Sequence, residues 1–348
     1  MPEVRPDPVR VSRIAALIVL ILAAMGSAAT PPANVLHREA IVVDLHSDTL
    51  LDVASRKRDV AVRGTAGHID LPRLRDGGVD VQVFAVFTHP RDAGRGFRRA
   101  TELLDAFDAL ARTRRELAPA GTVDAIELAV KAGRVAAVLS VENGSALDGD
   151  LANLDRLHAR GVRILSLTWN RSNDLADGAI EETHGGLTPL GRRVLARMRE
   201  LRMVVDVSHL SEKAFWDVLE ATAGPILATH SNAAGLTPHP RNLTDRQLRA
   251  LAARDGVVGV NFYPTFTGGA TIGHVLAHVD YLVKIAGVNH VALGSDFDGF
   301  SDTVAGLEDV SRLPALTTGL VARGYSAEDI RKILGGNALR VFRTVWGR

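Results

Sequence analysis

Residues 40–48 read AIVVDLHSD, a short and mostly apolar run that ends in a histidine and an aspartate. The run is too short and too continuously apolar for a strand with one face in water, and it is typical of a strand buried on both faces. His46 and Asp48 are two residues apart, so in extended chain their side chains point to the same side. The segment therefore predicts a buried strand that presents two polar side chains where it ends.

Runs of the same kind recur along the chain. With 40–45 as the first, we predict eight strands, the other seven at residues 79–87, 136–141, 162–167, 204–207, 225–228, 257–261 and 290–293. Amphipathic stretches with helical periodicity lie between them, for example at residues 98–115, 148–160, 190–201, 212–222, 245–254 and 273–286. Strands that alternate with helices in this way predict an α/β fold, a (β/α)8 barrel of the TIM type, with an open doubly wound sheet as the alternative.

Local signals refine two of the helical regions. Thr244 is followed three residues later by Gln247, which is the pattern of a capping box at a helix start. Residues 326–342 predict two helical pieces, separated by Gly335 and Gly336.

Composition limits the class of protein. The 348 residues suffice for one large barrel domain or two ordinary domains. Apolar residues make up 46% and charged residues 23%, which excludes a disordered chain and a membrane protein with many spans. The net charge of +1, without any block of like charges, gives no electrostatic basis for binding nucleic acid. Cysteine is absent, so any metal must be held by histidines and carboxylates.

The first thirty residues differ from the rest. An apolar run at residues 14–24 is preceded by Arg5, Arg10 and Arg13 and is followed by small residues at 26–29. A positive start, a short apolar middle and a small-residue end are the layout of a secretory signal peptide. The apolar run is shorter than the ~20 residues that span a bilayer, which favours cleavage over a permanent anchor.

This pattern predicts where the protein works. We expect cleavage near Ala28, with residues 1–30 as a signal peptide or N-terminal anchor and residues 34–348 as a single barrel domain. The protein is then exported to the periplasm or the extracellular space and has no stable membrane span after cleavage. An uncleaved segment that holds it at the membrane is the alternative.

Acidic residues and histidines follow five of the eight predicted strands. They are His46 with Asp48, Glu142, His209, His230 and Asp296. Taken singly, a histidine at a strand end is more often a hydrogen-bonded structural residue, and Asp48 also suits a helix cap. The carboxyl ends of the strands of a parallel barrel, however, meet at one mouth. Polar groups that converge there need compensation, and a metal cluster provides it.

Three histidines and two carboxylates form the predicted ligand set: His46, Asp48, Glu142, His209 and His230. Nitrogen and oxygen donors of this kind suit Zn²⁺, with Mn²⁺ or Co²⁺ as substitutes, whereas Mg²⁺ prefers oxygen and water. The strand of Glu142 lies between the first strand and the two strands that carry His209 and His230, so Glu142 is the natural bridge. A bridging carboxylate holds two ions ~3.5–4 Å apart, as in two-metal hydrolases. We therefore predict two zinc ions per chain.

Several longer motifs resemble the membrane (renal) dipeptidase family of zinc metallopeptidases, which has an amidohydrolase-like barrel. They are VDLHSDTL at 43–50, SVENG at 140–144, VDVSH at 205–209, ATHSNAAGLTPHPRNLTD at 228–245, GSDFDGF at 294–300 and GGNALRVF at 335–342. Each is moderately specific, but together they cover the chain after its first thirty residues almost end to end and in the family's order.

The resemblance implies a function and a role for each site residue. It places His46 and Asp48 on one zinc, His209 and His230 on the other, and Glu142 between them. It implies that Arg241 binds the terminal carboxylate of the substrate, although Arg241 taken alone reads as a solvated turn residue between Pro240 and Asn242. It also implies that Asp296 shuttles a proton to the leaving amine. The expected reaction is zinc-dependent hydrolysis of dipeptides by a metal-activated bridging hydroxide.

One departure from the family pattern affects the substrate site. Better-known animal members read Leu-Thr-His after the fourth strand, where the histidine is taken to steady the oxyanion or the substrate. This chain has Trp169 in its place, followed by Asn170. Asn170 and Asn173 are the candidates for the missing hydrogen bond.

The departure keeps other functions open. One alternative is a related metal-dependent amidohydrolase that acts on a lactam, a lactone or an N-acyl amino acid. Another is a binding protein on the same barrel with weakened catalysis, since a fold does not fix a function. The acceptance of D-residues at the C-terminal position and a homodimeric state are also left open.

Other ionisable residues receive lesser roles. His68 and His278 lie in a predicted loop and a predicted helix and are expected to be solvated or capping. Asp44 and Asp206 lie within strands and are expected to hold neighbouring ligands from a second layer.

Overall fold

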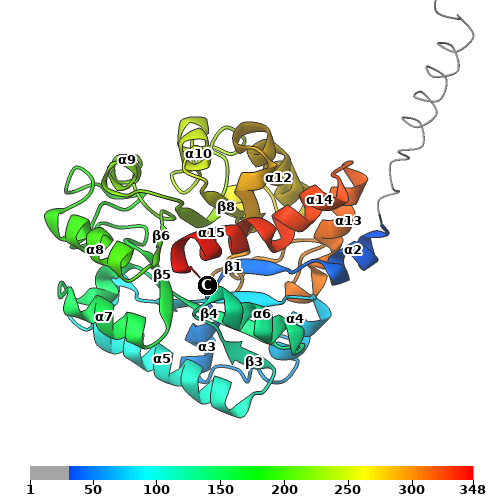
Figure 1. Ribbon diagram of the computed structural model, residues 1–348, viewed down its shortest axis with the longest axis horizontal. Coiled ribbons are helices and arrows are strands. Elements are labelled where there is room, and N and C mark those ends of the chain that lie inside the picture. Colours follow the sequence, from blue (N-terminus) through cyan, green and yellow to red (C-terminus); the bar gives the residue numbers. More distant parts are fainter. Residues whose placement is uncertain (1–30, 348) are drawn as a thin grey trace, which may run out of the picture. The chain divides into compact units, whose positions relative to one another are not determined.

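The computed structural model describes residues 31–347, and its strands close into a barrel (Figure 1). Neighbouring strands are parallel, in the order β1-β2-β4-β5-β6-β7-β8-β9, and β1 pairs with β9 to close the ring. The barrel strands are β1 Val43–Ser47, β2 Val81–Phe87, β4 Val135–Glu142, β5 Val162–Ser166, β6 Val204–Asp206, β7 Leu227–Ser231, β8 Val257–Val260 and β9 Val291–Leu293. The predicted (β/α)8 barrel is confirmed, and the open doubly wound alternative is wrong.

A short strand outside the ring was not predicted. β3 (Leu117–Pro119) pairs in parallel with the first residues of β4, before β4 meets β5. Three residues are too few to show an apolar run, so the sequence carries no distinct signal for β3.

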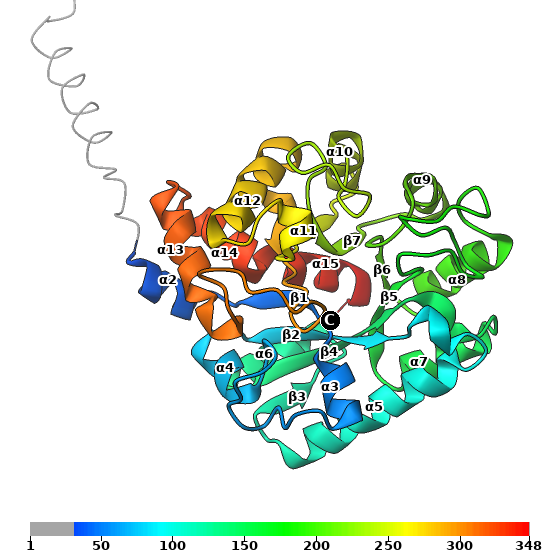
Figure 2. The same cartoon turned by 180° about the vertical axis from the view of Figure 1, so that it is seen from behind.

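Helices cover the outside of the barrel (Figures 1 and 2). They are α2 Ala33–Glu39, α3 Thr49–Ser55, α4 Leu71–Asp76, α5 Gly96–Thr113, α6 Val123–Lys131, α7 Ala152–Ala159, α8 Pro189–Glu200, α9 Glu212–Ala221, α10 Asp245–Ala252, α11 Pro264–Thr267, α12 Ile272–Ala286, α13 Pro314–Ala322, α14 Ala327–Arg331 and α15 Asn337–Trp346. The predicted capping box at the start of α10 is confirmed: Thr244 and Gln247 bond reciprocally. None of the helices among residues 31–347 has the length and apolar character needed to cross a membrane.

The C-terminal helical region differs from the prediction. Gly335 and Gly336 do not separate two pieces, because a π-helical turn over Lys332–Gly336 joins α14 to α15. A Cβ atom on Gly335 would lie 2.1 Å from the carbonyl oxygen of Ile41. The glycine is therefore needed for close packing of the helix against the chain before β1, and it does not break the helix.

The two ends of the barrel differ in chemistry. Apolar side chains of the strands fill the interior and continue into α6 and α15 at the end where the strands begin. A second apolar cluster packs the outer helices against the barrel wall. The end where the strands finish instead carries His46, Glu142 and His230, all nearly inaccessible to solvent. In barrels of this type the first end provides stability and the second carries the chemistry.

Candidate metal centre

The five predicted ligands meet at the carboxyl ends of the strands, with Glu142 between the two pairs. Its Oε2 atom lies 3.3 Å from Nε2 of His46, which is in turn 3.6 Å from Oδ2 of Asp48. Its Oε1 atom lies 2.9 Å from Nε2 of His209 and 3.9 Å from Nε2 of His230. The two oxygens of one carboxylate thus face two separate groups of ligand atoms. Asp296 also belongs to the cluster, because one of its carboxylate oxygens lies within 4.8 Å of ring nitrogens of His46 and His230.

Several atoms of the cluster have the properties expected of metal ligands. Both ring nitrogens of His46 and Oε2 of Glu142 are buried, yet they have no hydrogen-bond partner among the residues that the structure describes. A Cβ atom on Gly299 would lie 2.5 Å from Oδ2 of Asp48 and 2.6 Å from Oδ1 of Asp296, so only glycine leaves room beside these carboxylates. Buried polar atoms without partners are costly. The residues therefore fit bound cations.

Hydrogen bonds fix the orientation of two imidazoles. Nδ1 of His209 lies 2.9 Å from the amide oxygen of Asn170. Nδ1 of His230 lies 2.8 Å from the hydroxyl of Thr229, which donates its own hydrogen to Oδ2 of Asp206 at 2.6 Å. Both Nδ1 atoms therefore act as donors, and each Nε2 keeps its lone pair for a metal. The two Nε2 atoms converge to 2.7 Å.

The carboxylates of the cluster are held in an unfavourable environment for negative charge. Burial, aided by the nearby charge of Asp48, raises the pKa of Glu142 to about 7. Burial also raises the pKa of Asp296 to about 6, although the positive charge of His46 opposes the shift. Divalent cations between these groups would supply the missing compensation.

The pKa values of the three histidines shift in opposite directions. Burial, together with the charges of Arg241 and His46, lowers the pKa of His209 and of His230 well below the usual value. Burial also disfavours the charged form of His46, but Glu142 and Asp48 outweigh it and raise its pKa well above the usual value. Neutral imidazoles at His209 and His230 are the form in which histidine binds metals.

Asp44 supports the cluster from β1, as Asp206 does from β6 through Thr229. The carboxylate of Asp44 accepts hydrogen bonds from the backbone N–H of Ser295 at 2.8 Å and from its hydroxyl at 2.7 Å. These bonds connect β1 to the loop that carries Asp296. The predicted second-layer position of Asp44 and Asp206 therefore agrees with the geometry.

Asp296 points into the cluster from a constrained backbone. Its Oδ2 atom accepts a hydrogen bond from the side chain of Asn261 at 2.8 Å, and its Oδ1 atom lies 3.9 Å from Nε2 of His46. Asp296 has φ 62° and His209 has φ 70°, in the left-handed region that residues other than glycine rarely adopt. Such conformations concentrate at functional sites because the surrounding structure must maintain them.

Arg241 is buried, and its interpretation as a solvated turn residue is wrong. The residue is only 3% exposed, and one terminal nitrogen of its side chain donates to the carbonyl oxygen of His230 at 3.3 Å. The guanidinium lies 5.5 Å from the ring centre of Phe266, and Nε has no partner among the described residues. Burial lowers the pKa of Arg241 to about 10, so the group stays charged at neutral pH. It is therefore a buried cation with unused hydrogen-bond donors.

A cleft of about 590 Å³, open solvent at its mouth included, opens over the cluster. It is lined by Asp48, Leu51, Phe87, Glu142, Trp169, Asn170, His209, Tyr263, Phe266, Asp296, Asp298 and Gly299. Of the two asparagines considered for the missing hydrogen bond, Asn170 contacts His209, whereas the side-chain amide of Asn173 donates to Asn143 and Leu167 and serves the fold.

The structure corrects two histidine predictions. His278 is fully buried, and its Nδ1 accepts a hydrogen bond from the backbone of Ala233. His68 is also buried and its Nδ1 accepts from the backbone of Asp298, so neither histidine is solvated.

Sequence reasoning also missed two residues of the site. The roles of Thr229 and Asn261 depend on contacts between different strands. A polar residue directly beside a strand-end histidine was the only signal for Thr229.

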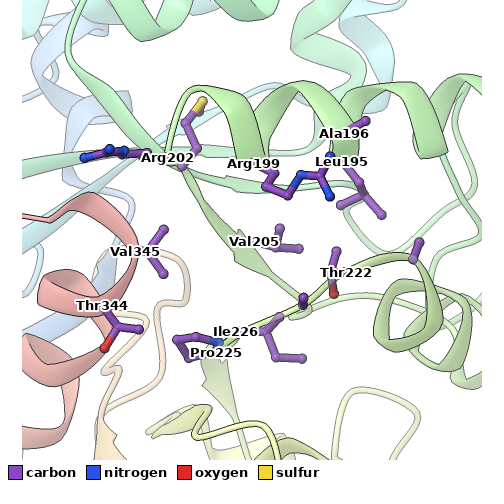
Figure 3. A pocket seen from close by; sticks show the side chains of 14 residues that line it. Leu195, Ala196, Arg199, Arg202, Val205, Thr222, Pro225, Ile226, Thr344 and Val345 are labelled. Carbon is purple, nitrogen blue, oxygen red and sulfur yellow. The ribbon is translucent and has the colours of Figure 1, made fainter.

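A second cavity lies at the other end of the barrel, between α8, α9 and the end of α15 (Figure 3). Apolar side chains such as Leu195, Val205 and Ile226 line it, and Arg199 and Arg202 are its only ionisable residues. Its lining offers no histidine or carboxylate for a metal.

A closed parallel barrel with histidines and carboxylates gathered at its strand ends is typical of metal-dependent enzymes. Comparison with known proteins narrows this class. A model of the membrane dipeptidases (peptidase family M19) matches residues 31–346. The chain belongs to this family and is a metallodipeptidase, as its motifs predicted.

Individual relatives and solved structures support the assignment of the chain to this family. Dipeptidase aclJ of Aspergillus oryzae is 34% identical over 296 residues, which cover 80% of this chain and 70% of that protein. The crystal structure of dipeptidase AC, a metallopeptidase of family M19, has a TM-score of 0.83 and 32% identity, and the match covers 89% of this chain and 99% of that one. A metallopeptidase from Rhodobacter sphaeroides, liganded with a phosphinate mimic of L-Ala-D-Ala, also has a TM-score of 0.83, with 30% identity and coverage of 88% and 100%.

Proposed function

We propose that the protein hydrolyses dipeptides with two zinc ions held by the predicted ligands. The main support for this proposal is the position of the Glu142 carboxylate, whose two oxygens face His46 on one side and His209 on the other. Together with Asp48 and His230 these residues would provide two sites that share one bridging ligand. Histidine nitrogen and carboxylate oxygen suit Zn²⁺, and Mn²⁺ or Co²⁺ could replace it.

The roles of the protein groups follow from their positions. When bound, two ions of this kind lower the pKa of a water molecule and polarise the scissile carbonyl. Asp296, held by Asn261 and facing His46, takes the proton that the attacking water loses and passes it to the leaving amine nitrogen. Asn170 and Thr229 keep the imidazoles of His209 and His230 oriented throughout.

The substrate is a dipeptide with a free carboxyl end, because Arg241 supplies a buried cation beside the cluster. A planar guanidinium suits a bidentate grip on a carboxylate and so sets the distance from the chain end to the scissile bond. The related Rhodobacter sphaeroides metallopeptidase was crystallised with a mimic of L-Ala-D-Ala. We infer that this chain also accepts a D-residue at the C-terminal position.

Arg241→Ala tests this function. We expect the main effect to be a rise in KM. Amidation of the substrate's C-terminus should cause a similar loss of kcat/KM in the wild type. The two losses should not add, because both delete one interaction. A buried charged pair lost in this way costs roughly 2–5 kcal/mol. The measurement is kcat and KM of both enzymes on free and amidated Ala-D-Ala.

Arg249→Ala is the matched control, since that arginine is exposed on α10. It should leave both constants unchanged. Equal activity of the wild type on free and amidated dipeptides would contradict the role of Arg241, and the broader amidohydrolase function would then be favoured.

We also propose that the protein is exported with residues 1–30 as its signal, although these residues lie outside those the structure describes. A reporter fused to residues 1–30 should cross the cytoplasmic membrane, because the positive start and short apolar run are what the export machinery recognises. Mass spectrometry of the mature protein should find an N-terminus near residue 29. An intact Met1 in mature soluble protein would contradict cleavage.

A further inference from the structure

We propose that Trp169 and Phe87 form the surface that receives the side chain of the substrate's N-terminal residue, so that the enzyme prefers dipeptides with an apolar or aromatic N-terminal residue. This inference rests on the proposed dipeptidase function and names the substrates that the site favours.

Trp169 is held in the cleft by other rings. Its ring centre lies 5.4 Å from that of Phe87, in an edge contact with an interplanar angle of 63°. It lies 5.6 Å from the ring centre of His89, whose own side chain caps the 3₁₀ turn that follows. Trp169 is only half-buried and lines the cleft together with Phe87. The remaining surface of a well-supported indole therefore faces the substrate space.

Trp169 is also close to the reacting centre. Its ring centre lies 6.2 Å from that of His209, one of the proposed ligands. A side chain that contacts Trp169 must therefore belong to a residue bound beside the cluster.

The order of the strands indicates which substrate residue this is. Arg241 follows β7, and in the closed ring β7 lies opposite β2, which ends at Phe87. A dipeptide with its carboxylate on Arg241 and its scissile carbonyl at the cluster extends its N-terminal half away from β7 and toward β2, where Trp169, which follows β5, contacts Phe87. The C-terminal half lies on the side of Phe266, which packs beneath Arg241.

The chemistry of the surface sets the preference. Indole and phenyl rings offer a large apolar area, and burying an apolar side chain against it is favourable in proportion to the area removed from water. Trp169 and Phe87 offer an apolar contact beside the cluster, so selectivity among N-terminal side chains should depend on apolar area.

Two matched series of dipeptides test the inference. The first varies the N-terminal residue (Gly-Ala, Leu-Ala and Phe-Ala), and the second varies the C-terminal residue (Ala-Gly, Ala-Leu and Ala-Phe). For the wild type we expect kcat/KM to rise from Gly-Ala to Phe-Ala. Trp169→Ala should reduce the Phe-Ala to Gly-Ala ratio by roughly 10-fold to 100-fold, the range for apolar discrimination in a pocket. The Ala-Phe to Ala-Gly ratio should stay within about twofold, because that side chain lies beside Phe266.

Two further variants make the result decisive. Trp169→Phe should keep most of the N-terminal preference, and it also provides a test if the alanine variant does not fold. Trp216→Phe is the control, since Trp216 lies on α9 beneath Arg246 and away from the cleft. It should leave both ratios unchanged.

Each outcome has a distinct meaning. An unchanged Phe-Ala to Gly-Ala ratio in a folded, metal-loaded Trp169→Ala enzyme would overturn the inference and leave the dipeptidase function intact. A change in the C-terminal series instead would also overturn it, because Trp169 would then face the other residue. A wild-type enzyme that cleaves no dipeptide of either series would overturn the proposed function itself.

Discussion

Glu142→Gln should remove bound metal from both positions and abolish dipeptide hydrolysis. The substitution keeps the size of the side chain but deletes the charge that both groups of ligand atoms share. Loss of an outer-shell partner already weakens metal affinity ~10–100-fold, so loss of the bridging ligand should exceed the upper value. The measurements are metal content by elemental analysis after zinc loading and kcat/KM on a dipeptide.

Two variants show whether the loss of both ions is specific to the bridging position of Glu142. His209→Ala should mainly weaken one of the two sites, because its Nε2 faces only Oε1 of Glu142. Glu127→Gln, on the exposed face of α6, should change neither metal content nor activity. A Glu142→Gln protein that retains both ions would mean that Glu142 is not shared between them.

Asp296→Asn should depress kcat by about 10²–10⁴-fold, the usual contribution of a positioned general acid or base. KM and metal content should stay nearly unchanged, because an amide has the same shape and its oxygen can still accept from Asn261. A proton shuttle acts only along the reaction path, which is why the loss should appear in kcat. Asp302→Asn, six residues further along in an exposed stretch, is the control and should behave as the wild type.

The same experiment separates two roles of Asp296. Its carboxylate lies near His46 and His230, so Asp296 has the position of a ligand as well as that of a proton carrier. If Asp296→Asn loses one ion per chain, Asp296 holds metal, and the proposed division between ligands and catalytic residue is wrong.

The barrel could be predicted because its strands are buried on both faces. Each barrel strand needs a short, continuously apolar run, and such runs are visible in one sequence without any partner. β3 escaped prediction because three residues carry no pattern. The helix through Gly335 was misjudged because the local cost of glycine in a helix is visible in the sequence, whereas the close approach of Ile41 is not.

The ligands of the site were accessible to sequence reasoning for a similar reason. His46, Glu142 and His230 each stand at the end of a mostly apolar run, and the geometry of a parallel barrel then brings them together. The burial of Arg241 depends on how the loop after β7 folds back, and no residue pattern reports it. The contact of Trp169 with Phe87 joins β5 to β2 across β4, so it too emerges only from the structure.

A zinc titration of metal-stripped protein, with bound metal and dipeptide hydrolysis followed on the same samples, tests whether two ions at this site are needed for the reaction. We expect no hydrolysis without metal and full activity only when about two ions are bound per chain, as two-metal catalysis requires. Full activity of the stripped protein, or no retention of zinc at neutral pH, would contradict this expectation.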